Sequence, residues 1–495
     1  MDFSLLGINA AVRGMAAAQT ALNTMGHNVA NANTEGYSRQ RVNVSAASPL
    51  PTPGFNTPVR IASIGAGTQI NGINRLRDEF LDLQVRRENA TLGANQAFAE
   101  HVKLIEDVFH EPSETGLSAL FNEFFNSWHT LTSNPESPGV RAVVRDQAAT
   151  LANALNDASQ RLNTQRKEID AQLRNAITDI NLFTTQIAQL NVQIAEVQVG
   201  GGAANQLLDQ RDLLLEKISK LVNLHTVQHE DGNVWVYLNG RALVAGSIQT
   251  PLDFRPNAEG GYSDIVFEGD VVPQPEVGAA LGALLQLRDD VIGRDRFRPA
   301  VPALPDTPNG ILHRLDTLAN VLANEVNALH RAGTLTDGTP SNRDFFVNFR
   351  NPGSSTMGAG QIAVNPDIMN GTAGLELIAT GGSPSTGPGD TGTAKLIAAL
   401  RNKSTMGPTA TFEDDYRNFL AGLGVLGLSA QRMVKNQGEV LNHLSQRKEE
   451  VSGVNMDEEM ADMVRFQHAY QASARALNTF DEILDRIING LGAGR

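Results

Sequence analysis

The chain contains no cysteine among its 495 residues. That absence excludes disulfide bonds, thiolate metal sites and cysteine nucleophiles. Aromatic residues make up only 5%, and 40 basic residues face 54 acidic ones, for a formal net charge of −14. Nucleic-acid binding needs a basic surface, and binding to an anionic membrane needs blocks of lysine and arginine. We therefore expect neither nucleic acid nor a membrane as a partner.

Long hydrophobic runs are also missing. The longest, near residues 277–287 and 419–428, are too short and too rich in glycine to span a bilayer. Polar residues interrupt the apolar positions of the first 25 residues, so these do not resemble a cleavable signal. We expect a soluble chain that would leave the cell, if at all, by a route without a classical signal. At about 100–200 residues per domain, it should hold two to four domains.

The N-terminal stretch carries a narrow apolar stripe with heptad spacing, which predicts a helix that packs against one partner along its length. The flanking positions are mostly alanine, asparagine, threonine and glutamine, so they lack the charges of a solvated coiled coil. An ordinary core helix remains the alternative. The main row is Ile8, Met15, Leu22 and Val29, and Ala11, Ala18 and Met25 stand three positions after its first three members.

The C-terminus carries a matching stripe. Asn455 is a plausible N-cap, with Glu458 placed as in a capping box, and Asp457, Glu458 and Glu459 suit the positive end of a helix dipole. Two apolar seams at opposite ends of one chain suggest that the ends pair with each other. The C-terminal seam consists of Met463, Phe466, Tyr470, Leu477, Phe480, Leu484 and Ile487, with Met456 one heptad before it.

Between the ends, periodicity predicts a long helix over 139–199, with a possible break near 166–170, followed by a second helix over 203–224. Short alternating runs over 225–270 predict β-hairpins. Helical patterns return at 277–288, 311–330, 394–401 and about 414–450, and a loop-rich β insert is expected between 332 and 393. At about 1.5 Å per residue, an unbroken first helix would extend roughly 90 Å, which is the length of a shaft.

Few residues point to chemistry. His225 and His229 have a spacing that can bind zinc, but the neighbouring Glu230 and Asp231 fall in a predicted turn, so we do not expect a metal site. Asp209 and Asp212 flank Arg211 without a nucleophile and its base, and a structural ion pair with another helix is the simpler role. No Walker loop, nucleophile elbow or dinucleotide-binding fingerprint is found. We expect no catalytic residue and no cofactor.

The most distinctive segment leaves the first predicted helix. It reads NVANANTEGYSRQ, with Asn, Thr and Gly residues that favour a turn. It resembles the N-terminal signature of the bacterial flagellar axial proteins, and the Ser-Arg-Gln continuation, LLDQRD at 207–212, LDTLANVLANEVNALH at 315–330 and VSGVNMDEE at 451–459 resemble their hook–filament junction family. The residues that carry the N-terminal motif are Asn28, Asn31, Thr34, Gly36, Tyr37, Arg39 and Gln40.

The resemblance implies a mainly α protein with β-rich inserts, built as an elongated multidomain rod with a terminal coiled coil of paired ends. The expected divisions are 1–72 with 440–495 for the terminal domain, and 73–224, 276–330 and 394–439 for the long-helix middle domain. The segments 225–275 and 331–393 form the β inserts.

The resemblance also implies a structural subunit of the flagellum, secreted by type III export and required for filament assembly and motility. It would form a helical ring of its own copies at the hook–filament junction, meeting hook protein, the second junction protein and an export chaperone. The alternatives are another axial protein, such as flagellin, the second junction protein or hook protein, an enzyme or adhesin carried on axial ends, or a chaperone-like partner of helices.

Overall fold

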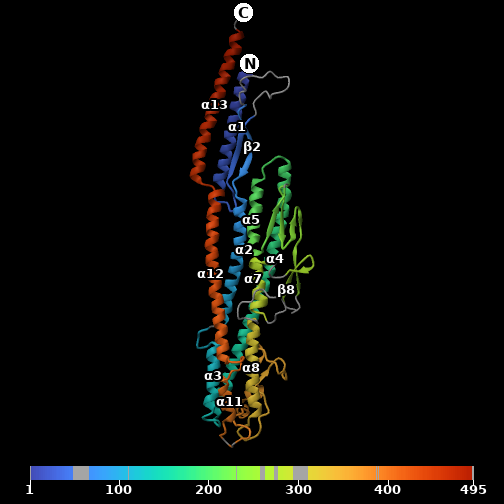
Figure 1. Ribbon diagram of the computed structural model, residues 1–495, viewed down its shortest axis with the longest axis vertical. Coiled ribbons are helices and arrows are strands. Elements are labelled where there is room, and N and C mark those ends of the chain that lie inside the picture. Colours follow the sequence, from blue (N-terminus) through green and yellow to red (C-terminus); the bar gives the residue numbers. More distant parts are fainter. Residues whose placement is uncertain are drawn as a thin grey trace.

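The computed structural model describes residues 2–47, 66–109, 111–229, 231–256, 262–272, 277–293, 310–385, 387 and 389–492, with side chains described from residue 7 to 486 of these. The molecule is an elongated, mainly helical rod with small antiparallel sheets along one side (Figure 1). This confirms the expected α-rich rod with β inserts. None of the helices in these ranges is both long and apolar enough to cross a membrane.

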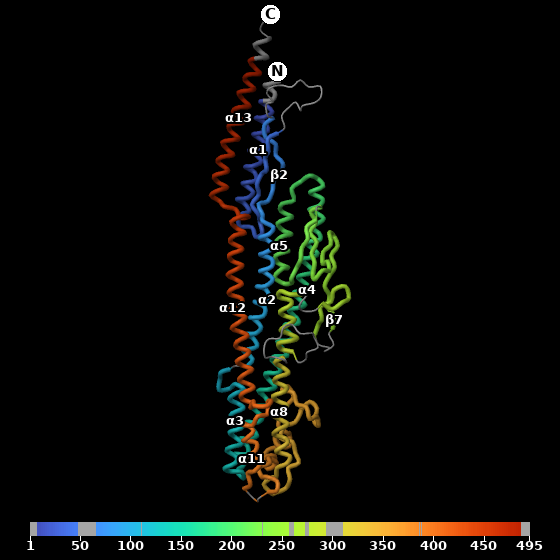
Figure 2. The backbone as a smooth tube through the Cα atoms, viewed as in Figure 1, coloured from blue at the N-terminus to red at the C-terminus, as the bar shows by residue number. Residues whose placement is uncertain are grey.

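The two chain ends lie together at one tip of the rod (Figure 2). Helix α1 (Asp2–Asn31) packs along α13 (Met456–Gly492). A Cβ built on Gly7 would lie 2.5 Å from Phe480 Cζ, and one built on Gly14 would lie 3.0 Å from Ser473 Oγ. As the residue number rises on α1, it falls by the same amount on α13, so the helices are antiparallel and in constant register. Glycine lets the two backbones approach closely.

A two-stranded antiparallel ribbon follows α1. Strands β1 (Gln40–Ala46) and β2 (Thr68–Arg75) pair with a register shift between Asn43 and Val44. We expected the terminal part to be helical, and this ribbon departs from that expectation. In β1, Val42 and Val44 alternate with polar residues, a period-two pattern that favours a strand over a helix. In β2, Ile70 and Ile73 stand three positions apart, and the register shift places them opposite Val44 and Val42.

The body of the rod is built from long helices. Helix α4 (Pro138–Val199) has 62 residues, begins with proline in its first turn and ends before Gly200. Helix α5 (Asn205–Leu221) turns back along it, and α2 (Glu79–Phe109) lies between α5 and α12 (Phe412–Ser452). Leucine and isoleucine residues spaced along α4 are almost fully buried: most of the helix lines the main core, and Leu190 and Ile194 near its end form a second, small cluster with Ala204.

The helix α4 is unbroken where a break near 166–170 was possible. Asp170 is buried there, and its carboxylate accepts hydrogen bonds from Arg288 at 2.6 Å and from the Ser263 amide at 2.9 Å. Arg288 belongs to a short π-helical turn, Leu287–Val291, that follows α7 (Ala279–Gln286). The polar residues that interrupt the apolar pattern are thus side-chain anchors for the β insert.

That insert lies against one side of α4 (Figure 1). One sheet has the order β3-β4-β5-β6 and the other has the order β7-β8-β9. All pairings are antiparallel, as expected for successive hairpins. The strands are β3 (His225–Gln228), β4 (Val234–Leu238), β5 (Arg241–Ala245), β6 (Ile248–Gln249), β7 (Leu252–Pro256), β8 (Ser263–Phe267) and β9 (Asp270–Val271).

The opposite tip of the rod is formed by α3 (Leu117–Leu131) and α8 (Ile311–Ala332) together with the segment that follows α8. That segment is less β-rich than expected, because its two strands are only three residues long. An aromatic cluster of Phe124, Trp128, Phe345 and Phe346 fills the core there. The remaining elements are β10 (Phe346–Asn348), β11 (Ile362–Val364), α9 (Pro366–Met369), α10 (Gly371–Glu376), α11 (Gly392–Ala399) and the 3₁₀ turn Leu400–Asn402.

His330, at the end of α8, is buried within this tip. Its Nε2 accepts a hydrogen bond from the Ala379 amide at 3.0 Å, so Nδ1 carries the proton and donates to the Arg343 carbonyl at 2.9 Å. A second proton on Nε2 would point at an N–H group. Burial lowers the pKa of His330 from 6.5 to about 4, against the smaller opposing effects of the Arg343 carbonyl and of Asp344.

His330 should therefore make the tip acid-sensitive. Below pH 6.5 the imidazole of His330 is protonated in the unfolded chain but stays neutral in the folded chain. The free energy of unfolding therefore falls until the pH reaches about 4. The slope is about 1.4 kcal/mol per pH unit. Denaturant unfolding at several pH values should show this slope reduced in His330→Gln and retained in His129→Gln, an exposed histidine on α3. Equal slopes in the wild type and His330→Gln would contradict the assignment.

Candidate assembly interface

The axial motif forms a polar node at the base of the paired helices, where α1 ends and the chain turns into β1. Gly36 has φ of +79°, a backbone conformation that side chains with a Cβ rarely adopt, and a Cβ there would lie 3.2 Å from Leu213 on α5. Asn31 donates to the His27 carbonyl, and Thr34 donates to Asn31. These local contacts close the turn that directs Tyr37 back toward α1.

Asn28 lies at the centre of the node and is 1% exposed. Its amide pairs with the main chain of Gln40, donating to the carbonyl at 2.9 Å and accepting from the N–H at 3.0 Å. It also donates to Glu459 at 3.0 Å and accepts from the Tyr37 hydroxyl at 2.7 Å. One side chain therefore joins α1, β1 and α13, and only an amide offers the required donors and acceptor together.

Tyr37 remains a neutral donor in this setting. Burial raises its pKa to about 12, and the charges of Asp209 and Glu459 act in the same direction. Its hydroxyl also lies 2.9 Å from His27 Nδ1. Because the Tyr37 hydroxyl donates to Asn28, the imidazole supplies the proton of the other bond. His27 is a member of the node that the motif alone did not identify.

Arg39 joins the ribbon to the start of α13. Its guanidinium donates to Glu459 at 2.6 Å and to Glu458 at 2.7 Å, and its amide donates to the Ser452 carbonyl at 2.8 Å. Burial by itself lowers the pKa of Arg39, but hydrogen bonds and charges from the two carboxylates outweigh it and raise the pKa. Glu459 is only 2% exposed, so it depends on Arg39 and Asn28 for compensation.

A second ionic cluster connects the node to the body of the rod. Asp209 on α5 accepts from the Ser38 hydroxyl at 2.7 Å and from Arg75 at 2.8 Å. Asp212 is bound by Arg75 at 2.9 Å and Arg77 at 3.1 Å. We expected these carboxylates to pair with another helix, and that was wrong: their cations lie at the end of β2 and just before α2. The sequence feature that could have indicated these partners is the pair Arg75 and Arg77, which stand two residues apart at the end of β2.

The lone arginine of the LLDQRD segment points elsewhere. Arg211 is 2% exposed and donates to Asn191 at 3.0 Å and to the Gly232 carbonyl at 2.7 Å. Burial lowers the pKa of Arg211 to about 10, because the opposing charge of Asp212 is too weak to offset it. Arg211 thus anchors the β3–β4 turn to α4 and α5, and it takes no part in the node.

Asn455 caps α13 in the expected manner, because its side-chain oxygen accepts from the amides of Asp457 at 3.0 Å and Glu458 at 3.3 Å. The reciprocal capping-box bond from Glu458 is not formed within the described chain, and the Glu458 carboxylate binds Arg39 instead. Asp457 stays exposed at the helix start. The acidic cluster therefore serves the cap and the node at once.

The two seams are only partly covered in a single chain. On α1 the small residues Ala11, Ala18 and Ala21, with Met25, are buried, whereas the larger row flanks them and stays half-exposed. On α13 the whole described row is half-exposed, and Ile487 has a side chain outside the described residues. The half-exposed seam residues are Ile8, Met15, Leu22, Val29, Met463, Phe466, Tyr470, Leu477, Phe480 and Leu484.

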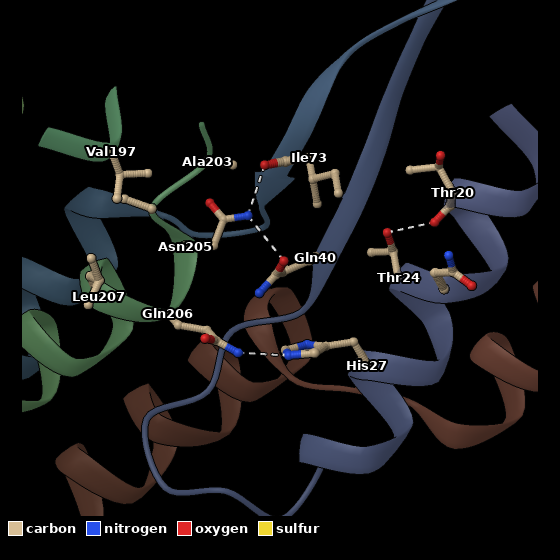
Figure 3. A pocket seen from close by; sticks show the side chains of 12 residues that line it. Thr20, Thr24, His27, Gln40, Ile73, Val197, Ala203, Asn205, Gln206 and Leu207 are labelled. Carbon is tan, nitrogen blue, oxygen red and sulfur yellow. Dashed lines mark hydrogen bonds between the residues drawn. The ribbon is translucent and has the colours of Figure 1, made fainter. Parts of the chain in front are cut away.

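A notch of about 550 Å³ opens beside the node, between α1, the ribbon and the start of α5. Figure 3 shows Asn205 donating to the Ile73 carbonyl and to Gln40, and Gln206 donating to His27. No aspartate, glutamate, lysine or arginine is among its lining residues, and the amides of Asn205 and Gln206 bond to other groups of the lining. We interpret the notch as the place where α1 and the β1–β2 ribbon meet the ends of α4 and α5.

The histidine pair does not gather ligands. His225 lies on β3 and His229 directly follows it, and their rings are tilted against those of Tyr237 and Trp235 at centroid distances of 6.4 and 4.8 Å. Glu230, one of the possible third ligands, lies outside the described residues. Over the described chain, no group of three or more acidic, histidine or cysteine side chains is arranged to hold a metal.

Family comparisons match three segments of the chain. A model described as the flagellar hook-associated protein FlgK helical domain matches residues 102–346. The flagella basal body rod protein model matches 8–37, and the flagellar basal body rod FlgEFG protein C-terminal model matches 445–490. The last two segments are those that meet at the node. Paired ends of this type, joined by a long helical body, define an axial protein of the bacterial flagellum.

Full-length relatives narrow this class. Flagellar hook-associated protein 1 of Bacillus subtilis (strain 168) is 31% identical over 100% of both chains, and that of Escherichia coli (strain K12) is 27% identical over 97% of this chain and 99% of its own. The chain belongs to the flagellar hook-associated protein 1 (FlgK) family. The flagellar hook junction protein FlgK from Burkholderia pseudomallei has the same fold, with a TM-score of 0.63 and 18% identity over 74% of this chain and 100% of its own.

The node gives a sharp test in the substitution Asn28→Asp, which keeps the shape but replaces the donor facing Glu459 by a carboxylate oxygen. Two buried carboxylates would then face each other, at a cost of about 2–4 kcal/mol. Hydrogen exchange of the amides at 37–40 and 456–463 should accelerate. Asn23→Asp, on an exposed position of the same helix, should leave it unchanged. Equal exchange in the two variants would show that Asn28 does not hold the node.

Proposed function

We propose that this protein is a structural subunit of the bacterial flagellum that polymerises at the distal end of the hook and forms the hook–filament junction. The observation that carries the proposal is the antiparallel pairing of the two chain ends, fixed at its base by the Asn28–Glu459–Arg39 node. The names of the full-length relatives support the same role. In this role the protein is required for filament assembly and motility, and it is exported to the flagellum.

The half-exposed seams are the proposed assembly surfaces. Each terminal helix buries one narrow face against the other and leaves apolar side chains open, including Met460 at 52% and Val464 at 50% exposure. An isolated two-helix pair with so little buried area is marginal in water. Neighbouring copies in a helical ring would cover these side chains, so stability of the ends would come from assembly.

The proposed partners follow from this position. They are other copies of this chain in the ring, hook protein on one side, the second junction protein on the other, and a chaperone before export. The paired ends 1–72 and 440–495 would form the inner assembly domain, and 73–224, 276–330 and 394–439 the middle layer. The inserts 225–275 and 331–393 would face outward. Freedom from disulfides suits a chain that is exported unfolded.

The alternatives differ in what they require. Another axial protein would share the paired ends, and locating this chain in isolated flagella by an antibody would separate it from flagellin, hook protein and the second junction protein. An enzyme or adhesin would need a working site in the inserts. Among the described residues of the inserts, most charged side chains lie exposed, and the half-buried Asp390 accepts hydrogen bonds from the Gly382 and Gly392 amides as part of a turn.

Leu22→Asp or Leu477→Asp should abolish junction assembly while leaving the middle of the rod folded. A carboxylate held in an apolar contact costs several kcal/mol, more than a marginal helix pair can offset. Motility and the presence of filaments measure assembly, and circular dichroism of the purified monomer measures the fold. Leu182→Asp, an exposed leucine on α4, is the control. Normal motility in both seam variants would remove the seams as assembly surfaces.

We also propose that the protein has no enzymatic activity and requires no metal. Elemental analysis of the purified protein should find no stoichiometric zinc. The double variant His225→Ala with His229→Ala should assemble normally, because both side chains are exposed, His225 on β3 and His229 directly after it. Bound zinc, or loss of assembly with the fold intact, would mean that these histidines form a site.

A further inference from the structure

The largest cleft among those described lies away from the paired ends, between α2 and the first sheet of the β insert. It encloses about 750 Å³. Leu83, Arg86 and Arg87 of α2 form one wall, and β3 with Tyr237 of β4 forms the other. The volume is within the range of about 300–1,000 Å³ that is typical of ligand sites.

One wall of the cleft is an open sheet edge. β3 pairs only with β4, in a sheet whose order is β3-β4-β5-β6. The His229 amide donates to the Asn233 carbonyl across the turn, so Val227 and His225 also face β4 in the alternating antiparallel pattern. Thr226 and Gln228 then direct their main-chain N–H and C=O groups away from the sheet. Within the described chain, those groups have no hydrogen-bond partner. Such an edge can accept a further strand.

The other wall is cationic. Arg86 and Arg87 form no ion pair within the described chain, although the protein as a whole carries an excess of acidic residues. Arg86 Nε is buried and has no hydrogen-bond partner. No aspartate or glutamate is among the residues that line the cleft. A buried guanidinium donor without an acceptor carries a desolvation cost that a carboxylate would offset.

Apolar surface separates these polar features. Leu83 is 47% exposed and Val227 is 37% exposed, and both line the cleft. A strand added to β3 would present alternate side chains to α2, so apolar residues could cover Leu83 while acidic residues reach the arginines. A helix in the same place would leave the open edge of β3 unpaired.

We propose that this cleft binds an extended, acidic segment of a partner polypeptide, which adds as a strand to the free edge of β3 and places carboxylates against Arg86 and Arg87. The site is independent of the terminal seams and of the proposed role at the junction. The occupant follows from charge complementarity with the guanidinium groups of Arg86 and Arg87, for which the described chain provides no ion pair, and from the unpaired main-chain groups of β3.

The test uses the full-length monomer and a fluorescently labelled hexapeptide of alternating valine and glutamate. Fluorescence anisotropy should show saturable binding that weakens at least tenfold in high salt, because the contacts are ionic. A valine–lysine peptide of the same length should not bind. Hydrogen exchange should slow at residues 225–229 when the acidic peptide is present.

Two further experiments distinguish the contribution of the arginine charge from that of main-chain pairing with β3. Arg87→Glu should weaken binding at least tenfold, whereas Lys435→Glu, the same charge change at an exposed position of α12, should not. N-methylation of alternate peptide amides should abolish binding without altering the protein. Failure of the acidic peptide to bind, equal binding of the lysine peptide, equal loss in the two variants, or full binding of the N-methylated peptide would each overturn the proposal.

Discussion

The buried carboxylate of Glu459 is the constraint on which the arrangement of the chain ends depends. A charge that is 2% exposed is tolerated only when its hydrogen bonds are met, and here Arg39 and Asn28 meet them. Those two side chains belong to the other end of the sequence. The ends therefore cannot separate without breaking these charged hydrogen bonds, and a second cluster around Asp209 joins the node to the body of the rod.

The body of the rod and the paired ends, which meet at this node, differ in how much apolar surface they bury. The body has a large apolar core along most of α4, in which large side chains are fully buried. The paired ends bury mainly alanines and leave their larger apolar residues half-exposed. Burial contributes about 25 cal/mol per Å² of apolar surface, so the body should be stable alone and the ends should gain most of their stability from neighbours. This division suits a subunit that folds as a monomer and is completed by polymerisation.

The β insert obeys a similar logic of anchored polar side chains. Arg211, Asn191 and Asp170 interrupt the helical apolar pattern, yet each binds main-chain groups of the insert. These contacts fix the ends of strands and turns to the helices, and the buried faces of the sheets belong to the same apolar core as α4. The outer edge of β3 remains unpaired in this arrangement, and Arg86 and Arg87 of α2 lie beside it.

Sequence alone determined the periodic features. Heptad and strand patterns predicted the terminal helices, the 62-residue shaft and the hairpins, because side-chain spacing follows directly from backbone geometry. The motif around Tyr37 predicted the family. Pattern could not reveal the β1–β2 ribbon's place, the partners of Asp209 and Asp212, or the union of Asn28 with Glu459. Those pairs join residues up to 431 positions apart, and hydrogen-bond complementarity between them exists only once the tertiary structure has brought both ends of the chain to one point.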